Sequence, residues 1–139
     1  MHHPWRRLRD HLPDWDVVTR PLPVGIIGTT DTVRRQITLD SRMLQAQRRC
    51  TLDHELVHAE EGDVGCQDAK REAWVAQASA RRLIPLERLL EAVVWTENAQ
   101  ELADELWVDV DTLTCRIEHL HPAERAAVTR VLAARDSPE

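Results

Sequence analysis

The chain has 139 residues, of which 42% are hydrophobic and 30% charged, and its formal net charge is −6 at pH 7. This length predicts a single domain, residues 1–139, that buries about two-thirds of its unfolded surface. The negative charge argues against direct nucleic-acid binding, and the absence of any apolar run of ~20 residues argues against a membrane span. Three widely spaced cysteines and a basic N-terminus without an apolar run after it predict a cytoplasmic protein without disulfides or a signal peptide.

Residues 1–40 predict a short helix followed by a small antiparallel sheet of three strands. Apolar residues at helical spacing predict a helix over residues 4–12, which Pro13 ends. Alternating or continuous apolar residues then predict the strands, and residues 29–32 are expected to form a polar turn. The expected strands span residues 15–19, 24–28 and 33–40.

Residues 41–95 predict the central helices of the domain. A helix is expected from about residue 43 to 61, where Gly62 ends it, a second over residues 68–84, which Pro85 stops, and a third over residues 86–95. The first helix has two apolar flanks and a stripe that is expected to be solvated. One flank is Leu52, Leu56 and Ala59, the other is Cys50 and Val57, and the stripe is Arg49, Asp53 and Glu60.

The first of these helices contains the motif H-E-x-x-H at His54, Glu55 and His58. Residues four apart lie one turn apart on the same face of a helix, so both imidazoles reach one metal ion, with Glu55 beside them. Zinc lowers the pKa of a bound water to about 7, and a neighbouring carboxylate takes the proton as the water attacks a carbonyl. By chance the motif would arise in roughly 3 of 100 shuffled copies of this chain, so it needs a third ligand.

Glu72 is the third ligand that the pattern of the second helix predicts. It lies in the middle of a face of small and apolar residues, where an unpaired carboxylate is costly unless it is paired or bound to metal. Other acids and one thiol remain rival ligands, and two hydrogen-bonded core histidines remain the alternative for the motif itself. The rival ligands are Glu60, Glu61, Asp63, Cys66 and Asp68.

Residues 96–135 predict a helical subdomain, with helices over about residues 98–106, 110–120 and 122–134. The first two resemble a helix-turn-helix by spacing, yet Arg116 is the only basic residue on the second, which favours a packing module over a DNA reader. Seven acids against one base give residues 96–120 a local charge of −6 (1 − 7), which suits a basic protein partner.

The motif at His54–His58, followed by Glu72 thirteen residues before Pro85 in the run Arg-Leu-Ile-Pro, resembles the ImmA/IrrE family of metallo-endopeptidases over residues 35–120. The resemblance implies an α+β, zincin-like fold and a Zn²⁺ ion of gluzincin type, held by His54, His58 and Glu72, with Glu55 as general base and acid. It also implies a helix-turn-helix repressor of a phage, mobile element or stress regulon as the substrate. Many relatives have Asn at the position of Ala76, so one contact near the metal is expected to be missing or replaced here.

The same resemblance assigns two further roles. The strand Gln36, Ile37, Thr38, Leu39 and Asp40 is similar in position to the zincin edge strand that aligns an extended substrate. Related enzymes often stabilise the oxyanion with a tyrosine, and because this chain has none, His119, His121, an arginine or zinc alone are the candidates.

Two other functions stay open at the level of the sequence. One is a zinc-binding antirepressor that acts by protein–protein binding with weak or no turnover. The other is a small helix-turn-helix DNA-binding protein in which the H-E-x-x-H motif is coincidental.

Overall fold

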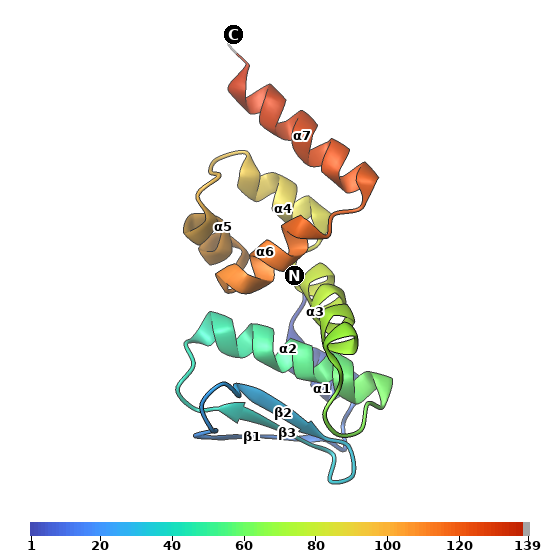
Figure 1. The fold of residues 1–139 in the computed structure, drawn as a ribbon. Helices are drawn as coiled ribbons and strands as arrows, with labels where there is room; N and C mark the ends of the chain where they lie inside the picture. The colour runs from blue at the N-terminus through green and yellow to red at the C-terminus, as the bar shows by residue number, and fades with distance from the viewer. Residues whose placement is uncertain (138–139) are drawn as a thin grey trace.

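The computed structural model describes residues 1–137, which form an α+β fold of seven helices and one three-stranded sheet, the class that the sequence predicts. The elements are α1 (Pro4–His11), β1 (Asp16–Arg20), β2 (Gly28–Asp31), β3 (Gln36–Asp40), α2 (Gln45–Glu61), α3 (Ala69–Leu83), α4 (Leu86–Val93), α5 (Ala99–Leu106), α6 (Val110–Glu118) and α7 (Pro122–Asp136). Figure 1 shows the sheet at one end, α2 across its face, and the helices α4–α7 on the far side of α2.

The sheet is mixed, so the prediction of three antiparallel strands is wrong for β1. The strand order is β1-β3-β2; β2 pairs antiparallel to β3, and β1 pairs parallel to β3 along its other edge. The segment that joins β1 to β2 contains Pro21 and Pro23, which donate no ladder hydrogen bond, so β1 and β2 do not form a hairpin. β3 is therefore the central strand, not the edge strand that the resemblance implies.

The second strand also lies later in the chain than predicted. Residues 24–28, expected as a strand, contain a turn in which the Ile26 amide donates to the Pro23 carbonyl at 3.1 Å. Gly25 has φ +88°, a left-handed conformation that glycine adopts without strain. The strand instead occupies Gly28–Asp31, most of the segment expected to be a polar turn. Thr29 and Thr30 fit it because β-branched residues favour extended backbone.

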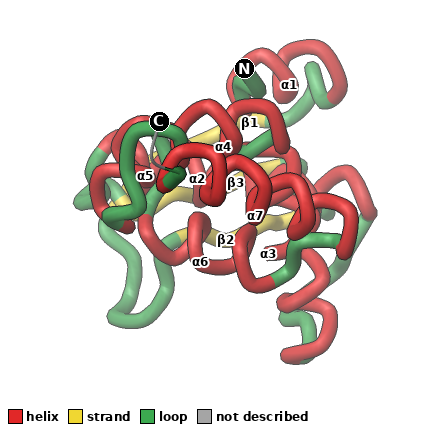
Figure 2. The backbone as a smooth tube through the Cα atoms, turned by 90° about the horizontal axis from the view of Figure 1, so that it is seen from above, coloured by secondary structure: helices red, strands yellow, loops and turns green. Residues whose placement is uncertain are grey.

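Helix α2 lies between two hydrophobic cores, as its two apolar flanks predict. Leu52 and Leu56 pack with Ile37 and Leu39 of β3, whereas Cys50 belongs to the core formed by the last turn of α3 and the C-terminal helices. Gly62 ends the helix in the left-handed conformation, φ +70°, as expected. Seen from above, in Figure 2, the strands lie behind the helices, which cover one face of the sheet.

Helices α3, α5 and α6 begin at side chains that cap them. Asp68, Asn98 and Asp109 each accept a hydrogen bond from the backbone amide three residues later, which satisfies a free donor of the first turn. Within residues 1–137 no helix is both long and apolar enough to cross a bilayer.

Asp53 is completely buried, so the prediction of a solvated stripe along α2 is wrong. Its carboxylate accepts hydrogen bonds from Ser79 Oγ at 2.7 Å and from Arg82 Nη2 at 2.8 Å, and lies 2.6 Å from His2 Nε2. Arg82 also donates to Glu60, which Arg7 of α1 binds as well. This group of charged side chains fastens α1 and α3 to the same face of α2.

The C-terminal helices enclose a second buried ion pair. The Arg116 side chain is 2% exposed and donates to both carboxylate oxygens of Glu124 and to the Ile84 carbonyl. Glu124 also accepts from Arg81, and these two guanidinium groups hold the pKa of its carboxyl well below the usual value. The only basic residue of α6 thus faces the interior, away from any DNA groove.

Candidate metal centre

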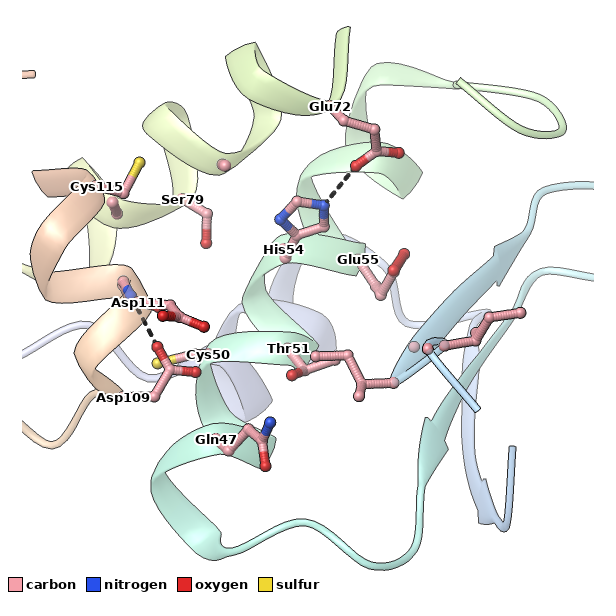
Figure 3. A pocket seen from close by; sticks show the side chains of 17 residues that line it. Gln47, Cys50, Thr51, His54, Glu55, Glu72, Ser79, Asp109, Asp111 and Cys115 are labelled. Carbon is pink, nitrogen blue, oxygen red and sulfur yellow. Dashed lines mark hydrogen bonds and ion pairs between the residues drawn. The ribbon is translucent and has the colours of Figure 1, made fainter. Parts of the chain in front are cut away.

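Helices α2 and α3 bring His54, His58 and Glu72 to one point. His54 Nε2 lies 2.9 Å from Glu72 Oε2, and His58 Nε2 lies 3.1 Å from Glu72 Oε1. One ligand atom from each residue lies within 4.8 Å of the other two. Figure 3 shows His54 and Glu72 directed toward each other from the two helices. Two imidazole nitrogens and one carboxylate oxygen are a donor set that suits divalent transition metals.

The three side chains are partly open to the surface. The side chain of His58 is 6% exposed, whereas those of His54 and Glu72 are 29% and 44% exposed. Val75, Ser79, Ala80 and Leu83 of α3 are buried, but Ala69 and Ala73 are exposed, so only the C-terminal part of the predicted face packs. Glu72 therefore lies at the rim of the packed face and not in its middle, and a small molecule or peptide has access to it there.

Asp63 orients His58 from the outside. The Nδ1 of His58 donates to Asp63 Oδ2 at 2.9 Å, which leaves Nε2 directed toward Glu72. Arg71 donates two hydrogen bonds to the same carboxylate, both at 3.0 Å, and stacks on Trp74 at 4.5 Å. Burial lowers the pKa of His58, but Asp63 and the carboxylates of Glu55 and Glu72 outweigh it and raise the pKa above its usual value.

The sequence predicts Asp63 only as a rival metal ligand, and its role as the hydrogen-bond acceptor that orients His58 was not predicted. The signal that could have found it is its position directly after Gly62, where the left-handed residue turns the chain back over the last turn of α2. An acidic side chain placed there reaches the outer nitrogen of a histidine in that turn.

The Asp63→Asn variant is expected to bind a divalent metal about 10- to 100-fold more weakly, because histidine ligands depend on an outer acceptor for ring orientation and basicity. Competition with a chromophoric chelator measures this affinity. Glu61→Gln, which removes one exposed charge from the same end of α2, is the matched control and should bind metal as the wild type does. Equal affinities for Asp63→Asn and wild type would contradict the role.

Glu55 lies next to the triad, between α2 and β2. Thr30 Oγ1 donates to Glu55 Oε2 at 2.8 Å, and the side chain is largely buried. Burial raises the pKa of the Glu55 carboxyl, and the hydrogen bond from Thr30 opposes part of that rise. At Gly28 a Cβ would lie 2.7 Å from Thr51 Cγ2 and 3.1 Å from Glu55 Cγ, so only glycine lets β2 approach α2 this closely.

Two cavities meet at the triad. The first, of about 450 Å³, extends along the N-terminal half of α2 to the start of α6. The second, of about 390 Å³, extends past His58 toward Asp63 and Cys66. Ile26, Gly28, Glu55 and Glu72 line both cavities, so the two form one groove beside β2.

Several predicted site residues lie elsewhere. His119 follows α6, where its Nδ1 lies 2.8 Å from the Cys115 carbonyl, and His121 caps α7; neither lines the groove. Strand β3, predicted to align a substrate, is paired on both edges, and β2 lines the groove instead. Of the rival ligands, Glu60 is paired with arginines, Asp68 caps α3, and Cys66 is exposed in the wall of the second cavity.

The arrangement therefore offers three convergent side chains that could hold a metal ion, a buried carboxylate beside them, and a groove formed by two adjoining cavities. A carboxylate in that position is able to take a proton from a molecule bound between it and the triad. Comparison of the chain with models of protein families, with curated proteins and with solved structures finds no match.

Proposed function

We propose that this protein is a zinc-dependent endopeptidase of gluzincin type, with a zincin-like fold and similar to the ImmA/IrrE family. One observation carries the proposal: His54, His58 and Glu72, from two helices, present ligand atoms within 4.8 Å of one another. Glu55 lies beside them, at the position in H-E-x-x-H that acts as general base.

The distances from the two imidazoles to Glu72 are close to those between ligand atoms around a zinc ion. Ligand atoms about 2.0–2.1 Å from a tetrahedral zinc ion are separated from each other by ~3.3 Å. The two distances from imidazole nitrogen to Glu72 oxygen are 2.9 and 3.1 Å, slightly shorter than this separation. His54, His58 and Glu72 would hold the metal, and Glu72 and Glu55 line the groove beside it.

Glu55 carries the protons of the reaction. Zinc, when bound, supplies Lewis-acid polarisation of water and of the peptide carbonyl. Glu55 takes a proton from the attacking water and delivers it to the amine that leaves. Thr30 donates a hydrogen bond to one carboxylate oxygen of Glu55, which leaves the other oxygen to take the proton.

The substrate we propose is a helix-turn-helix repressor, which the family resemblance implies. Strand β2 supports an extended substrate, because it lines the groove and, within residues 1–137, no strand pairs with its other edge. The acidic residues of α5 and α6 suit a basic, DNA-binding partner. With Arg116 buried, direct DNA reading by α6 lacks its only basic side chain.

The test combines metal content with cleavage of a repressor encoded beside the gene. The purified protein should bind one zinc ion, cleave the repressor, lose cleavage on chelation and regain it with zinc. Glu72→Ala should weaken zinc binding by more than about 100-fold, beyond the loss that follows removal of an outer partner. Unchanged zinc affinity in Glu72→Ala would exclude Glu72 as a ligand. Full zinc occupancy without cleavage of any repressor would reject the peptidase.

A second function, zinc-dependent binding of a repressor without turnover, is favoured by one observation. Neither His119 nor His121 lines the groove, and the chain contains no tyrosine, so the side chain that would stabilise the oxyanion is not identified. In that function, zinc-loaded protein would form a stable complex with intact repressor and relieve its binding to DNA.

A further inference from the structure

We infer that the peptide cleaved at this site carries an arginine or lysine side chain on the C-terminal side of the scissile bond, held by Asp109 and Asp111. This inference rests on the proposed peptidase function and names the class of substrate that the groove selects. It follows from the direction of the groove, from the residues at its two ends and from the positions of the nearby arginines.

The free edge of β2 sets the direction of an extended substrate. Antiparallel pairing is the more stable arrangement, so a peptide added to β2 runs from the Thr30 end toward the Gly28 end. The second cavity lies beside Thr29 and Thr30, and the first lies beside residues 25–28. The N-terminal half of the peptide therefore occupies the second cavity, and the residues after the cleaved bond occupy the first.

The first cavity carries negative charge at its far end. Asp109 and Asp111, at the start of α6, line it together with Gln47 and Thr112, and Figure 3 shows Asp109 beside Cys50 of α2. One oxygen of Asp109 caps the amide of Thr112, and Asp111 is exposed to solvent. The N-terminus of α6 contributes about half a positive charge, which offsets only part of two carboxylates.

The nearby arginines of the described residues bind other partners. In the part of the chain that the structure describes, the residues lining the two cavities include no arginine or lysine. Arg49, on the neighbouring turn of α2, donates instead to the carbonyls of Trp107 and His2. Arg81 is held by Glu124 on the far side of α6. The second cavity differs, because Arg71 neutralises Asp63 there.

These contacts predict an asymmetric preference along the peptide. A cationic side chain in the first cavity meets the carboxylates of Asp109 and Asp111. In the second cavity, Asp63 is already bound by Arg71, so the same side chain meets only Glu55 and Glu72 at the triad. An ion pair in a partly desolvated groove of this kind gives discrimination of about tenfold between arginine and an uncharged side chain of similar length. Selection should therefore appear on the C-terminal side of the bond alone.

Two measurements on the zinc-loaded protein test this inference. Digestion of a mixture of random decapeptides, with the products sequenced by mass spectrometry, should show arginine and lysine enriched about tenfold within the two positions after the cleaved bond. Fluorescence anisotropy with Glu55→Gln should give about tenfold tighter binding of a labelled peptide containing arginine than of its glutamine counterpart. The second measurement does not require turnover.

Variants that change the charge of Asp109 and Asp111 test whether these residues cause the preference for arginine. Asp111→Lys, alone and with Asp109→Asn, should remove the preference for arginine or reverse it in favour of a glutamate peptide. Glu105→Gln, which removes one exposed charge from α5, is the matched control and should keep the ratio of affinities. The same ratio in Asp111→Lys as in the wild type would overturn the assignment.

The cleavage and binding results separate the preference for basic residues from the peptidase function itself. Cleavage without enrichment of basic residues, or with enrichment before the bond, would overturn the inference and leave the peptidase intact. Absence of cleavage both in the mixture and of the repressor would reject the peptidase, and equal affinity for the arginine and glutamine peptides would overturn the inference separately.

Discussion

The Glu55→Gln variant is expected to bind zinc as tightly as the wild type and to hydrolyse peptides about 10²- to 10⁴-fold more slowly, the usual contribution of a positioned general base. Glutamine has the shape of glutamate, and its amide oxygen accepts the hydrogen bond from Thr30 that Glu55 accepts at 2.8 Å. The amide has no basic oxygen to take a proton from water. His54, His58 and Glu72 are unchanged, so metal binding should persist.

Two measurements on the same samples separate chemistry from metal loss. Zinc content per chain is measured first, and kcat/KM is then measured on a peptide chosen from the cleaved products. Glu61→Gln makes the same chemical change at an exposed position of α2 and should leave both quantities unaltered. A Glu55→Gln rate within a few fold of the wild type would remove Glu55 from the reaction. Loss of zinc would show that Glu55 supports the metal instead.

The Arg82→Leu variant is expected to lower the free energy of unfolding by about 3 kcal/mol, because it leaves a buried carboxylate with too few partners. Asp53 is completely buried and accepts from Arg82 at 2.8 to 3.2 Å. Ser79 and His2 remain beside it, which places the expected loss at the lower end of the usual 3–5 kcal/mol for a broken buried pair. Glu60 loses one of its two arginine partners in the same change.

Urea unfolding with a double-mutant cycle checks this expectation. Asp53→Asn combined with Arg82→Leu should be more stable than Arg82→Leu alone, because no unpaired charge remains in the interior. Arg130→Leu, at an exposed position of α7, should change the stability by less than about 0.5 kcal/mol. A loss for Arg82→Leu as small as that for Arg130→Leu would show that the pair does not stabilise the fold.

The same carboxylates predict loss of stability in acid. Burial raises the pKa of Asp53, but the hydrogen bonds from His2, Arg82 and Ser79 outweigh it, so the folded-state pKa lies below the usual value. Glu60 and Glu124 have lowered pKa values because arginines bind them, against the effect of burial. The unfolded chain then binds more protons, and stability present above about pH 4–5 falls as the pH drops further. Unfolding free energy measured from pH 7 to pH 2 should decrease more gradually in Glu124→Gln.

The helices and the triad were predictable because their signals are local. Capping residues such as Asn98 and Asp109 act on amides three residues away, and Gly62 ends α2 by its own conformation. The spacing of His54 and His58 is fixed by the helix, and Glu72 is the only acidic residue on a helical face whose other members are small or apolar. Each of these inferences depends on fewer than twenty consecutive residues.

The sheet order and the role of Asp53 were not predictable in this way. Pairing of β1 with β3 joins residues about twenty positions apart, and the sequence of neither strand indicates which strand it pairs with. Helical periodicity treats every charged residue as solvated, yet Asp53 finds its partners in His2 and Arg82, at separations of 51 and 29 residues. Ion pairs between residues so far apart in the sequence can be recognised only when the packing of the helices that carry them is known.

Gly28 makes strand and helix meet without an intervening side chain. The separation of β2 from α2 therefore depends on a position where even one added methyl group would lie 2.7 Å from Thr51 Cγ2. Any larger residue at Gly28 would have to move β2 away from α2 or displace the stem of Glu55, whose Cγ would lie 3.1 Å from the added Cβ. The spacing of strand and helix and the orientation of the Glu55 carboxylate are thus set at a single position.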